Sequence, residues 1–274
     1  MRLTILFAFA ALVGPNMAQA ADCGGYDTPC EVQGGTYHMA LPDGADPAGI
    51  VVHLHGAGAR GRQMLDGGMG KAALARGYAF VAPDGYHPGA PFERNWSVKA
   101  RGTSFDRDDA TFLRDVMADV RDRTGLTDVP VLLSGFSRGG SMVWDIACAD
   151  PDFATAYAPL AGAFWDDMPS GCAAPVMLYH THGWTDRTVP LEGRSLRDGT
   201  VVQGDVWESL KILRANNGCD ARQPERNSFD GDLWFRHWTD CAGGEIQLML
   251  HKGGHGAPQG WAGRMLDWFA RVMS

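Results

Sequence analysis

Three residues of the chain have the types and the order that can activate a hydroxyl group for attack. Ser137 lies in a Gly-x-Ser-x-Gly pattern within LLSGFSRGGSMVW, and Asp186 and His255 follow it far along the chain. A serine hydroxyl is a weak nucleophile until a base removes its proton, and a carboxylate can orient the histidine that does so. The pattern therefore predicts Ser137 as nucleophile, His255 as base and Asp186 as the orienting acid.

A strand before Ser137 and a helix after it would place its hydroxyl group at the end of the strand, exposed at the top of the sheet. The stretch VPVLLSGFS reads as a strand and Arg138–Ala149 as a helix, the arrangement of a nucleophile elbow. The turn is so tight that side chains at the flanking positions would collide, which explains Gly135 and Gly139. The helix start also offers backbone N–H groups, including that of Arg138, to a developing oxyanion. The alternative is a glycine-rich turn in which Ser137 only caps the helix.

Asp186 and His255 each follow an expected strand in the second half of the chain. Asp186 comes after the strand at 174–183, and His255 lies in the glycine-rich loop HKGGHGAPQGW. His251 is the competing base, but it is expected to lie on the preceding strand. The ordinary alternatives are a turn-forming aspartate and a surface-loop histidine. Both residues fall where the α/β-hydrolase order of Ser, Asp, His requires them, which favours the triad.

The remaining site residues are expected on loops that follow the carboxyl ends of the strands, as Ser137, Asp186 and His255 do. The loop HLHGAGARG should supply a second oxyanion donor, with Ala57 as first choice and Gly58 as the next. Trp184, Trp96 and His55 are expected to bind substrate, and Trp184 is favoured because it comes two residues before Asp186. Most tryptophans belong to the core, which is the ordinary alternative. Four tryptophans fall in or near these loops: Trp96, Trp165, Trp184 and Trp261.

Two His-x-His pairs raise the question of a metal site. They are His53 with His55 and His180 with His182. No carboxylate or cysteine is spaced to complete a ligand set around either pair. We therefore interpret them as strand ends beside the site, and expect neither a metal nor a cofactor.

The N-terminus reads as a cleavable export signal. Residues 1–20 contain an early Arg2, an apolar run and the small-x-small pattern Ala18-Gln19-Ala20. The run is too short for a permanent membrane anchor, although a retained anchor helix is the alternative. Cleavage would leave residues 21–274, a single domain without a membrane span, in a secreted or periplasmic location.

Six cysteines follow the predicted cleavage site, and an even number in an exported chain favours disulfides. Pairing between neighbours is the simplest expectation: Cys23 with Cys30, Cys148 with Cys172, and Cys219 with Cys241. Zinc binding is disfavoured because the chain has no Cys-x-x-Cys pair.

Apolar strands alternate with helices along the chain. Strands are expected at 35–42, 49–56, 78–85, 129–137, 154–162, 174–183, 233–238 and 245–252, and helices at 69–76, 108–124, 138–149, 203–216 and 260–273. This alternation predicts a mainly parallel sheet with helices on both faces, the α/β-hydrolase fold. The connections look short, which predicts an open cleft without a large lid. The net charge of -8 disfavours nucleic-acid and anionic-membrane partners, and the oligomeric state stays open.

The chain resembles the secreted esterases of the polyhydroxybutyrate depolymerase and feruloyl esterase group. The shared motifs are VVHLHGAG, FVAPDG, DDATFLRDV, LSGFSRGGSM, APLAG, HGWTDRTVP and GGHG. The resemblance implies an exported serine ester hydrolase that cleaves short-acyl, hydroxyalkanoate-oligomer or cell-wall esters through an acyl-enzyme. It also places the nucleophile at Ser137, the acid at Asp186 and the base at His255. A peptidase on the same fold and a non-catalytic carbohydrate-binding homologue remain as alternatives.

The chain departs from this group at two places that are expected to line the cleft. Arg138 stands where members often have a smaller or neutral residue, and Gly256-Ala257-Pro258 stands where an aromatic residue often follows the base. The Arg138 side chain would either approach a substrate carboxylate or pair with an acidic neighbour. The substrates of the group therefore transfer poorly to this chain.

Overall fold

The computed structural model of the chain describes residues 23, 28–44, 46–88, 92–219 and 223–274. The expected export signal at 1–20 lies outside the described residues. Within the described ranges, no helix is long and apolar enough to cross a membrane.

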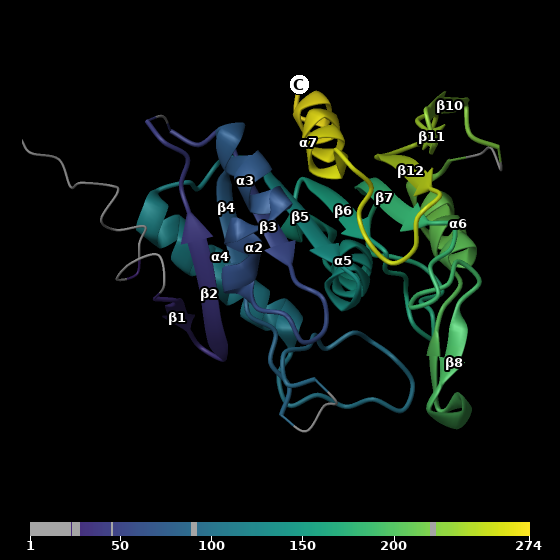
Figure 1. Cartoon of the computed structure of the whole chain (residues 1–274), viewed down its shortest axis with the longest axis horizontal. Helices are drawn as coiled ribbons and strands as arrows, with labels where there is room; N and C mark the ends of the chain where they lie inside the picture. Colours follow the sequence, from purple (N-terminus) through teal and green to yellow (C-terminus); the bar gives the residue numbers. More distant parts are fainter. Residues whose placement is uncertain (1–22, 24–27, 45, 89–91, 220–222) are drawn as a thin grey trace, which may run out of the picture.

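A ten-stranded sheet forms the centre of the molecule, in the order β1-β2-β4-β3-β5-β6-β7-β12-β11-β10 (Figure 1). The six central strands are parallel, and the strands at both edges are antiparallel. This confirms the prediction of a mainly parallel sheet. The strands are β1 (Cys30–Val32), β2 (Gly35–Ala40), β3 (Ile50–Leu54), β4 (Ala79–Pro83), β5 (Val131–Phe136), β6 (Ala156–Leu160), β7 (Met177–Gly183), β10 (Arg226–Asp230), β11 (Leu233–Trp238) and β12 (Glu245–His251).

Helices cover both faces of this sheet and enclose two apolar cores. The helices are α2 (Gly61–Asp66), α3 (Gly68–Ala75), α4 (Asp109–Thr124), α5 (Arg138–Ala149), α6 (Val206–Asn217) and α7 (Trp261–Val272). One core joins the sheet to α4, α5 and α6, and the other joins it to α2, α3 and α7. Adjacent strand residues such as Val51 and Val52 belong to opposite cores. The central strands are therefore apolar on both faces, as a covered parallel sheet requires.

The helix ends follow local capping chemistry, and one of them corrects a predicted boundary. The Asp205 side chain accepts hydrogen bonds from the first N–H groups of α6, so the helix begins at Val206. Gln203, the predicted start, instead lies in β9 (Val201–Gln203), which pairs with β8 (Arg194–Leu196). Gly125 ends α4 in a left-handed conformation, as predicted.

Two connections are longer than the sequence interpretation anticipated. Residues 84–108 join β4 to α4, and residues 184–205 join β7 to α6 and contain the β8–β9 hairpin. In Figure 1 both connections extend beyond the carboxyl ends of the central strands, at the bottom of the view. The prediction of short connections was wrong here, because turn-rich polar sequence gives no pattern that reveals a packed loop.

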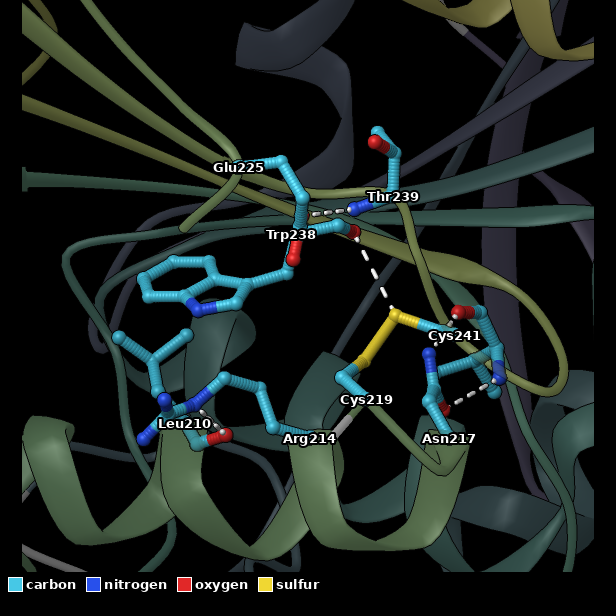
Figure 2. Close-up of a disulfide and its surroundings, with 9 residues drawn as sticks. Leu210, Arg214, Asn217, Cys219, Glu225, Trp238, Thr239 and Cys241 are labelled. Carbon is cyan, nitrogen blue, oxygen red and sulfur yellow. Dashed lines mark hydrogen bonds between the residues drawn. A yellow bond between two sulfur atoms is a disulfide. The ribbon is translucent and has the colours of Figure 1, made fainter. Parts of the chain in front are cut away.

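Three disulfides join neighbouring cysteines in the predicted pairs: Cys23–Cys30, Cys148–Cys172 and Cys219–Cys241. The last one links the end of α6 to the segment that follows β11 (Figure 2). Beside it the buried Trp238 ring packs under the guanidinium of Arg214, whose central carbon lies 4.9 Å from the ring centre. The bridge therefore fixes the antiparallel edge of the sheet against α6.

Removing the Cys148–Cys172 bridge should destabilise the fold without changing its architecture. The bridge joins residues 24 apart in sequence, and a loop of that size corresponds to about 3 kcal/mol in the chain-entropy model. We expect the double variant Cys148→Ser/Cys172→Ser to lose about this much free energy of unfolding. Denaturant titration of both proteins without reductant would measure the difference.

The hydrogen bond from the Ala173 N–H to the Cys148 carbonyl, 2.8 Å long, offers a second closure of the same loop. A loss below about 1 kcal/mol would mean that this backbone contact already closes the loop and that the disulfide adds little. Thiol titration of the denatured, unreduced wild-type protein is the control, and it should detect no free thiol.

Candidate active site

The turn between β5 and α5 holds Ser137 in an unusual backbone conformation. Its φ is 57° and its ψ is -118°, a region that residues with a side chain rarely adopt. A Cβ atom on Gly135 would lie 2.5 Å from the Gly139 carbonyl oxygen, and one on Gly139 would lie 2.4 Å from the Leu54 carbonyl oxygen. Both glycines are therefore required by close backbone contacts, as the sequence pattern predicted. The turn has the geometry of a nucleophile elbow.

Ser137, His255 and Asp186 form a continuous chain of hydrogen bonds. The Nε2 atom of His255 lies 2.8 Å from the Ser137 Oγ atom, 118 positions away in sequence. The Nδ1 atom of His255 lies 2.7 Å from Oδ2 of Asp186. The His255 ring also packs on Phe136, with the ring centres 4.8 Å apart. The fold thus brings together the three residues from three separate loops.

The Asp186 side chain has no exposed surface, and both of its carboxylate oxygens accept hydrogen bonds. Its Oδ1 atom accepts the backbone N–H groups of Thr188 and Val189, at 2.8 and 2.9 Å. Burial by itself would raise the pKa of Asp186, but hydrogen bonds from His255, Val189 and Thr188 hold it below its usual range. An ionised Asp186 accepts a hydrogen bond from the Nδ1–H group of His255, which leaves Nε2 with a lone pair directed at Ser137.

His251, the competing base, occupies a different position. It is the last residue of β12 and is nearly fully buried. Its Nδ1 atom accepts a hydrogen bond of 3.1 Å from the Gly253 N–H, so the ring supports the loop that carries His255. The geometry favours His255 as the base.

Two backbone N–H groups near Ser137 are available to an oxyanion. Arg138 is the first residue of α5, where N–H groups have no acceptor within the helix. In the described part of the chain the Ala57 N–H donates no hydrogen bond, whereas the Gly58 N–H donates to the Arg94 carbonyl at 2.7 Å. Ala57 and Arg138 line the same cavity as Ser137. The structure therefore favours Ala57 over Gly58 as the second donor.

A cavity of about 900 Å³ opens at Ser137. Its walls come largely from the two long connections, 84–108 and 184–205, and from the start of α5. Trp165 and Phe105 are its aromatic lining residues close to Arg138. Trp165 is one of the tryptophans that the sequence predicts in or near the loops of the site. No motif or spacing in the sequence indicated Phe105 or Arg197. They reach the cavity because the long connections fold back over it.

The structure contradicts two of the predicted substrate-binding residues. Trp96 and His55 have no exposed surface. The Trp96 indole donates a 2.8 Å hydrogen bond to the His55 carbonyl oxygen. The two nitrogens of the His55 ring contact the Gly56 carbonyl oxygen and the Gly85 N–H, at 2.7 and 3.0 Å. These side chains therefore buttress the loop that carries Ala57, and they cannot touch a substrate.

Trp184, also expected to bind substrate, is exposed but is absent from the residues that line the serine cavity. Its ring stacks on Trp234, with ring centres 5.6 Å apart, and Trp234 stacks in turn on the exposed Phe229. The phenylalanine and tryptophan residues that line the cavity are instead Phe92, Phe105 and Trp165.

The histidine pairs take part in internal hydrogen bonds. His180 Nε2 lies 3.0 Å from His182 Nδ1, and His182 Nε2 lies 2.7 Å from the Val189 carbonyl oxygen. His53 Nδ1 lies 3.2 Å from the Ser134 hydroxyl. Burial lowers the pKa values of all three imidazoles. Within the residues that the structure describes, no group of three His, Cys, Asp or Glu side chains is placed to hold a metal ion.

Comparison with known proteins links this geometry to esterases. The chain is 28% identical to feruloyl esterase C of Emericella nidulans, over 94% of this chain and 92% of that protein. It is 25% identical to feruloyl esterase D of Neurospora crassa, over 81% and 74%. No family model matches the chain.

Solved esterase structures share the fold. An acetyl xylan esterase from Aspergillus awamori superposes with a TM-score of 0.65 at 15% identity, over 86% of this chain and 94% of that one. A carboxylesterase from Mesorhizobium loti gives a TM-score of 0.59 at 17% identity, over 89% and 98%. Together with the sheet and helices described above, these likenesses establish the α/β-hydrolase fold.

Replacement of Asp186 by asparagine should inactivate the site through the tautomer of His255. The new side chain can keep its oxygen on the Thr188 and Val189 N–H groups, and it then presents an NH₂ group to His255 Nδ1. That nitrogen must become an acceptor, so the proton moves to Nε2, which can no longer accept the Ser137 proton. We expect kcat for p-nitrophenyl butyrate to fall by roughly 10³–10⁴-fold.

The matched control is His251→Gln, which changes an imidazole whose Nδ1 atom accepts a hydrogen bond from the Gly253 N–H of the neighbouring loop. Its kcat should stay within about tenfold of wild type, because it touches none of the three residues in the chain of hydrogen bonds. A fully active Asp186→Asn protein, or an inactive His251→Gln protein beside an active His255→Ala protein, would contradict this assignment.

Proposed function

Because the chain belongs to the feruloyl esterase-like family of α/β-hydrolases and is a carboxylic ester hydrolase, we propose that it acts through an acyl-enzyme formed on Ser137. The observation that carries the proposal is the chain of hydrogen bonds from Asp186 through His255 to Ser137. The strained elbow supports it, because backbone strain of this kind is typical of functional sites.

In the first half of the reaction, the Ser137 Oγ atom attacks the ester carbonyl carbon while its proton passes to His255 Nε2. The carbonyl oxygen becomes an oxyanion, and the N–H groups of Ala57 and Arg138 would stabilise it. The C–O bond to the alcohol then breaks, His255 returns the proton to the leaving oxygen, and the acyl group remains on Ser137.

In the second half, water attacks the acyl-enzyme and gives a proton to His255. The second tetrahedral intermediate collapses, the bond between the acyl group and Ser137 breaks, and His255 returns the proton to the serine oxygen. Asp186 stabilises the imidazolium in both halves without taking its proton. The products are the free acid and the regenerated enzyme.

The proposed substrates are short-acyl, hydroxyalkanoate-oligomer or cell-wall esters. The names of the feruloyl esterase relatives support the cell-wall class, and a cavity of about 900 Å³ has room for more than a small acyl group. The polyhydroxybutyrate type remains a prediction from the motifs. Water, rather than another nucleophile, is the expected acceptor of the acyl group.

The test is turnover of a panel of esters by wild type and Ser137→Ala. We expect hydrolysis of p-nitrophenyl butyrate and methyl ferulate, and loss of more than about a hundredfold in kcat for Ser137→Ala. A serine-directed phosphonate should label wild type at Ser137 and leave the variant unlabelled. The matching anilides measure amide hydrolysis, and turnover of anilides at rates equal to the esters would favour a peptidase. Absence of both labelling and turnover would favour a non-catalytic binding protein.

We also propose export after cleavage between Ala20 and Ala21. The support is the residue pattern of 1–20 and the three disulfides, which form in oxidising compartments. Mass spectrometry of the protein from its native host should show an N-terminus at Ala21 in the periplasmic or culture fraction. A full-length chain retained with the membrane fraction would instead support the anchor alternative.

A further inference from the structure

We propose that the preferred substrate of this site is an ester that carries a second, free carboxylate, bound by the guanidinium groups of Arg138 and Arg197. This inference rests on the proposed function, because it names the substrate class of the same site. Two cations line the cavity that opens at Ser137, and neither is neutralised by an ion pair within the described residues.

The Arg138 side chain is built into the wall of the cavity. Its central guanidinium carbon lies 4.3 Å from the centre of the Trp165 ring and 5.7 Å from that of Phe105. The Nε–H group donates a 3.2 Å hydrogen bond to the Trp96 carbonyl oxygen. The aromatic rings and this bond hold the guanidinium in one place, directly after the nucleophile in sequence.

No carboxylate in the described part of the chain forms an ion pair with Arg138, and the Nη donors form no hydrogen bond there. The contrast is Arg107, another partly buried arginine, which pairs with Asp109 at 2.5 Å. The acid that acts most strongly on Arg138 is Asp145, and burial raises its own pKa to about 7, so it is only partly ionised at neutral pH. A partly buried cation without a counter-ion is unfavourable unless a ligand supplies one.

Arg197 adds a second cation to the same cavity. It lies at the tip of the β8–β9 hairpin with a φ of 48°, in the left-handed region. No ion pair of Arg197 occurs among the described residues. Its positive charge also lowers the pKa of Arg138, as expected when a second cation lies nearby. In a chain of net charge -8, two arginines that line one cavity indicate a site for an anion.

The charge and shape of the site favour a carboxylate. One acidic side chain, Asp106, also lines the cavity, so the two arginines leave a single excess positive charge. A singly charged carboxylate balances that excess and matches the planar donor groups of a guanidinium. The carboxylate can belong to the acyl part, as in a dicarboxylate half-ester, or to the alcohol part, as at the acid end of a hydroxyacid oligomer.

The experiment compares charged and uncharged esters of equal length. For the acyl part the pair is p-nitrophenyl hydrogen glutarate and p-nitrophenyl hexanoate. For the alcohol part it is 3-(butyryloxy)butanoate and 2-pentyl butyrate. The measured quantity is the ratio of kcat/KM, charged over uncharged, within each pair. We expect a ratio of about tenfold or more in at least one pair, carried mainly by a lower KM, as for a charge-assisted hydrogen bond. Added NaCl should reduce the ratio.

Substitutions test whether the arginines cause this preference. Arg138→Gln and Arg197→Gln should each lower the ratio, Arg138→Gln by about tenfold, and Arg197→Glu should lower it further than Arg197→Gln. Because each variant is judged by a ratio, a general loss of folded protein cancels. The matched control is Arg76→Gln, an arginine paired with Asp267, which should leave the ratio unchanged.

Ratios at or below one in both pairs for wild type would overturn the inference, and so would ratios that none of the Arg138 and Arg197 variants changes. In both cases hydrolysis of the uncharged esters would leave the proposed function standing. If wild type hydrolyses no ester of either pair, the proposed function and this inference fail together.

Discussion

The tight turn between β5 and α5 is the constraint on which the site depends. It forces Ser137 to a φ of 57°, and it packs Gly135 and Gly139 against backbone carbonyl groups where a Cβ atom would overlap. The result is that the Ser137 hydroxyl group lies at the carboxyl end of the central strand β5. The first N–H groups of α5 lie beside it. The surrounding core makes this strain tolerable, because the buried strand β5 holds one end of the turn and the buried helix α5 holds the other.

The charges of Asp186 and Arg138 are stabilised in opposite ways. The Asp186 carboxylate is buried with three hydrogen bonds, from Thr188, Val189 and His255, so its charge is balanced inside the protein. The Arg138 guanidinium is held by aromatic rings and one carbonyl oxygen, with no carboxylate bound to it among the described residues. The first arrangement fixes the orientation of the His255 ring. The second leaves charge available to a ligand.

Polar residues behind the site serve mainly to hold its loops. His55 and Trp96 connect the loop of Ala57 to the segment after β4, and His251 contacts the loop that carries His255. Their side chains are buried, and their hydrogen bonds are to backbone groups. Such contacts rigidify connections that have no regular hydrogen-bonding pattern of their own. Aromatic and histidine residues near Ser137 can therefore serve the structure without touching a substrate.

The sequence alone determined the features that are local or periodic. The elbow glycines, the alternation of apolar strands and helices and the order of Ser137, Asp186 and His255 were all visible in it, because each follows from spacing and residue type. The pairing of neighbouring cysteines was only the simplest expectation, and the structure decided it. Tertiary structure decided which loop residues face the cavity. It buried Trp96 and His55, turned Trp184 toward Trp234, and brought Phe105 and Arg197 to the cavity. Loop side chains are placed by contacts between distant segments, and such contacts leave no periodic signal in the sequence.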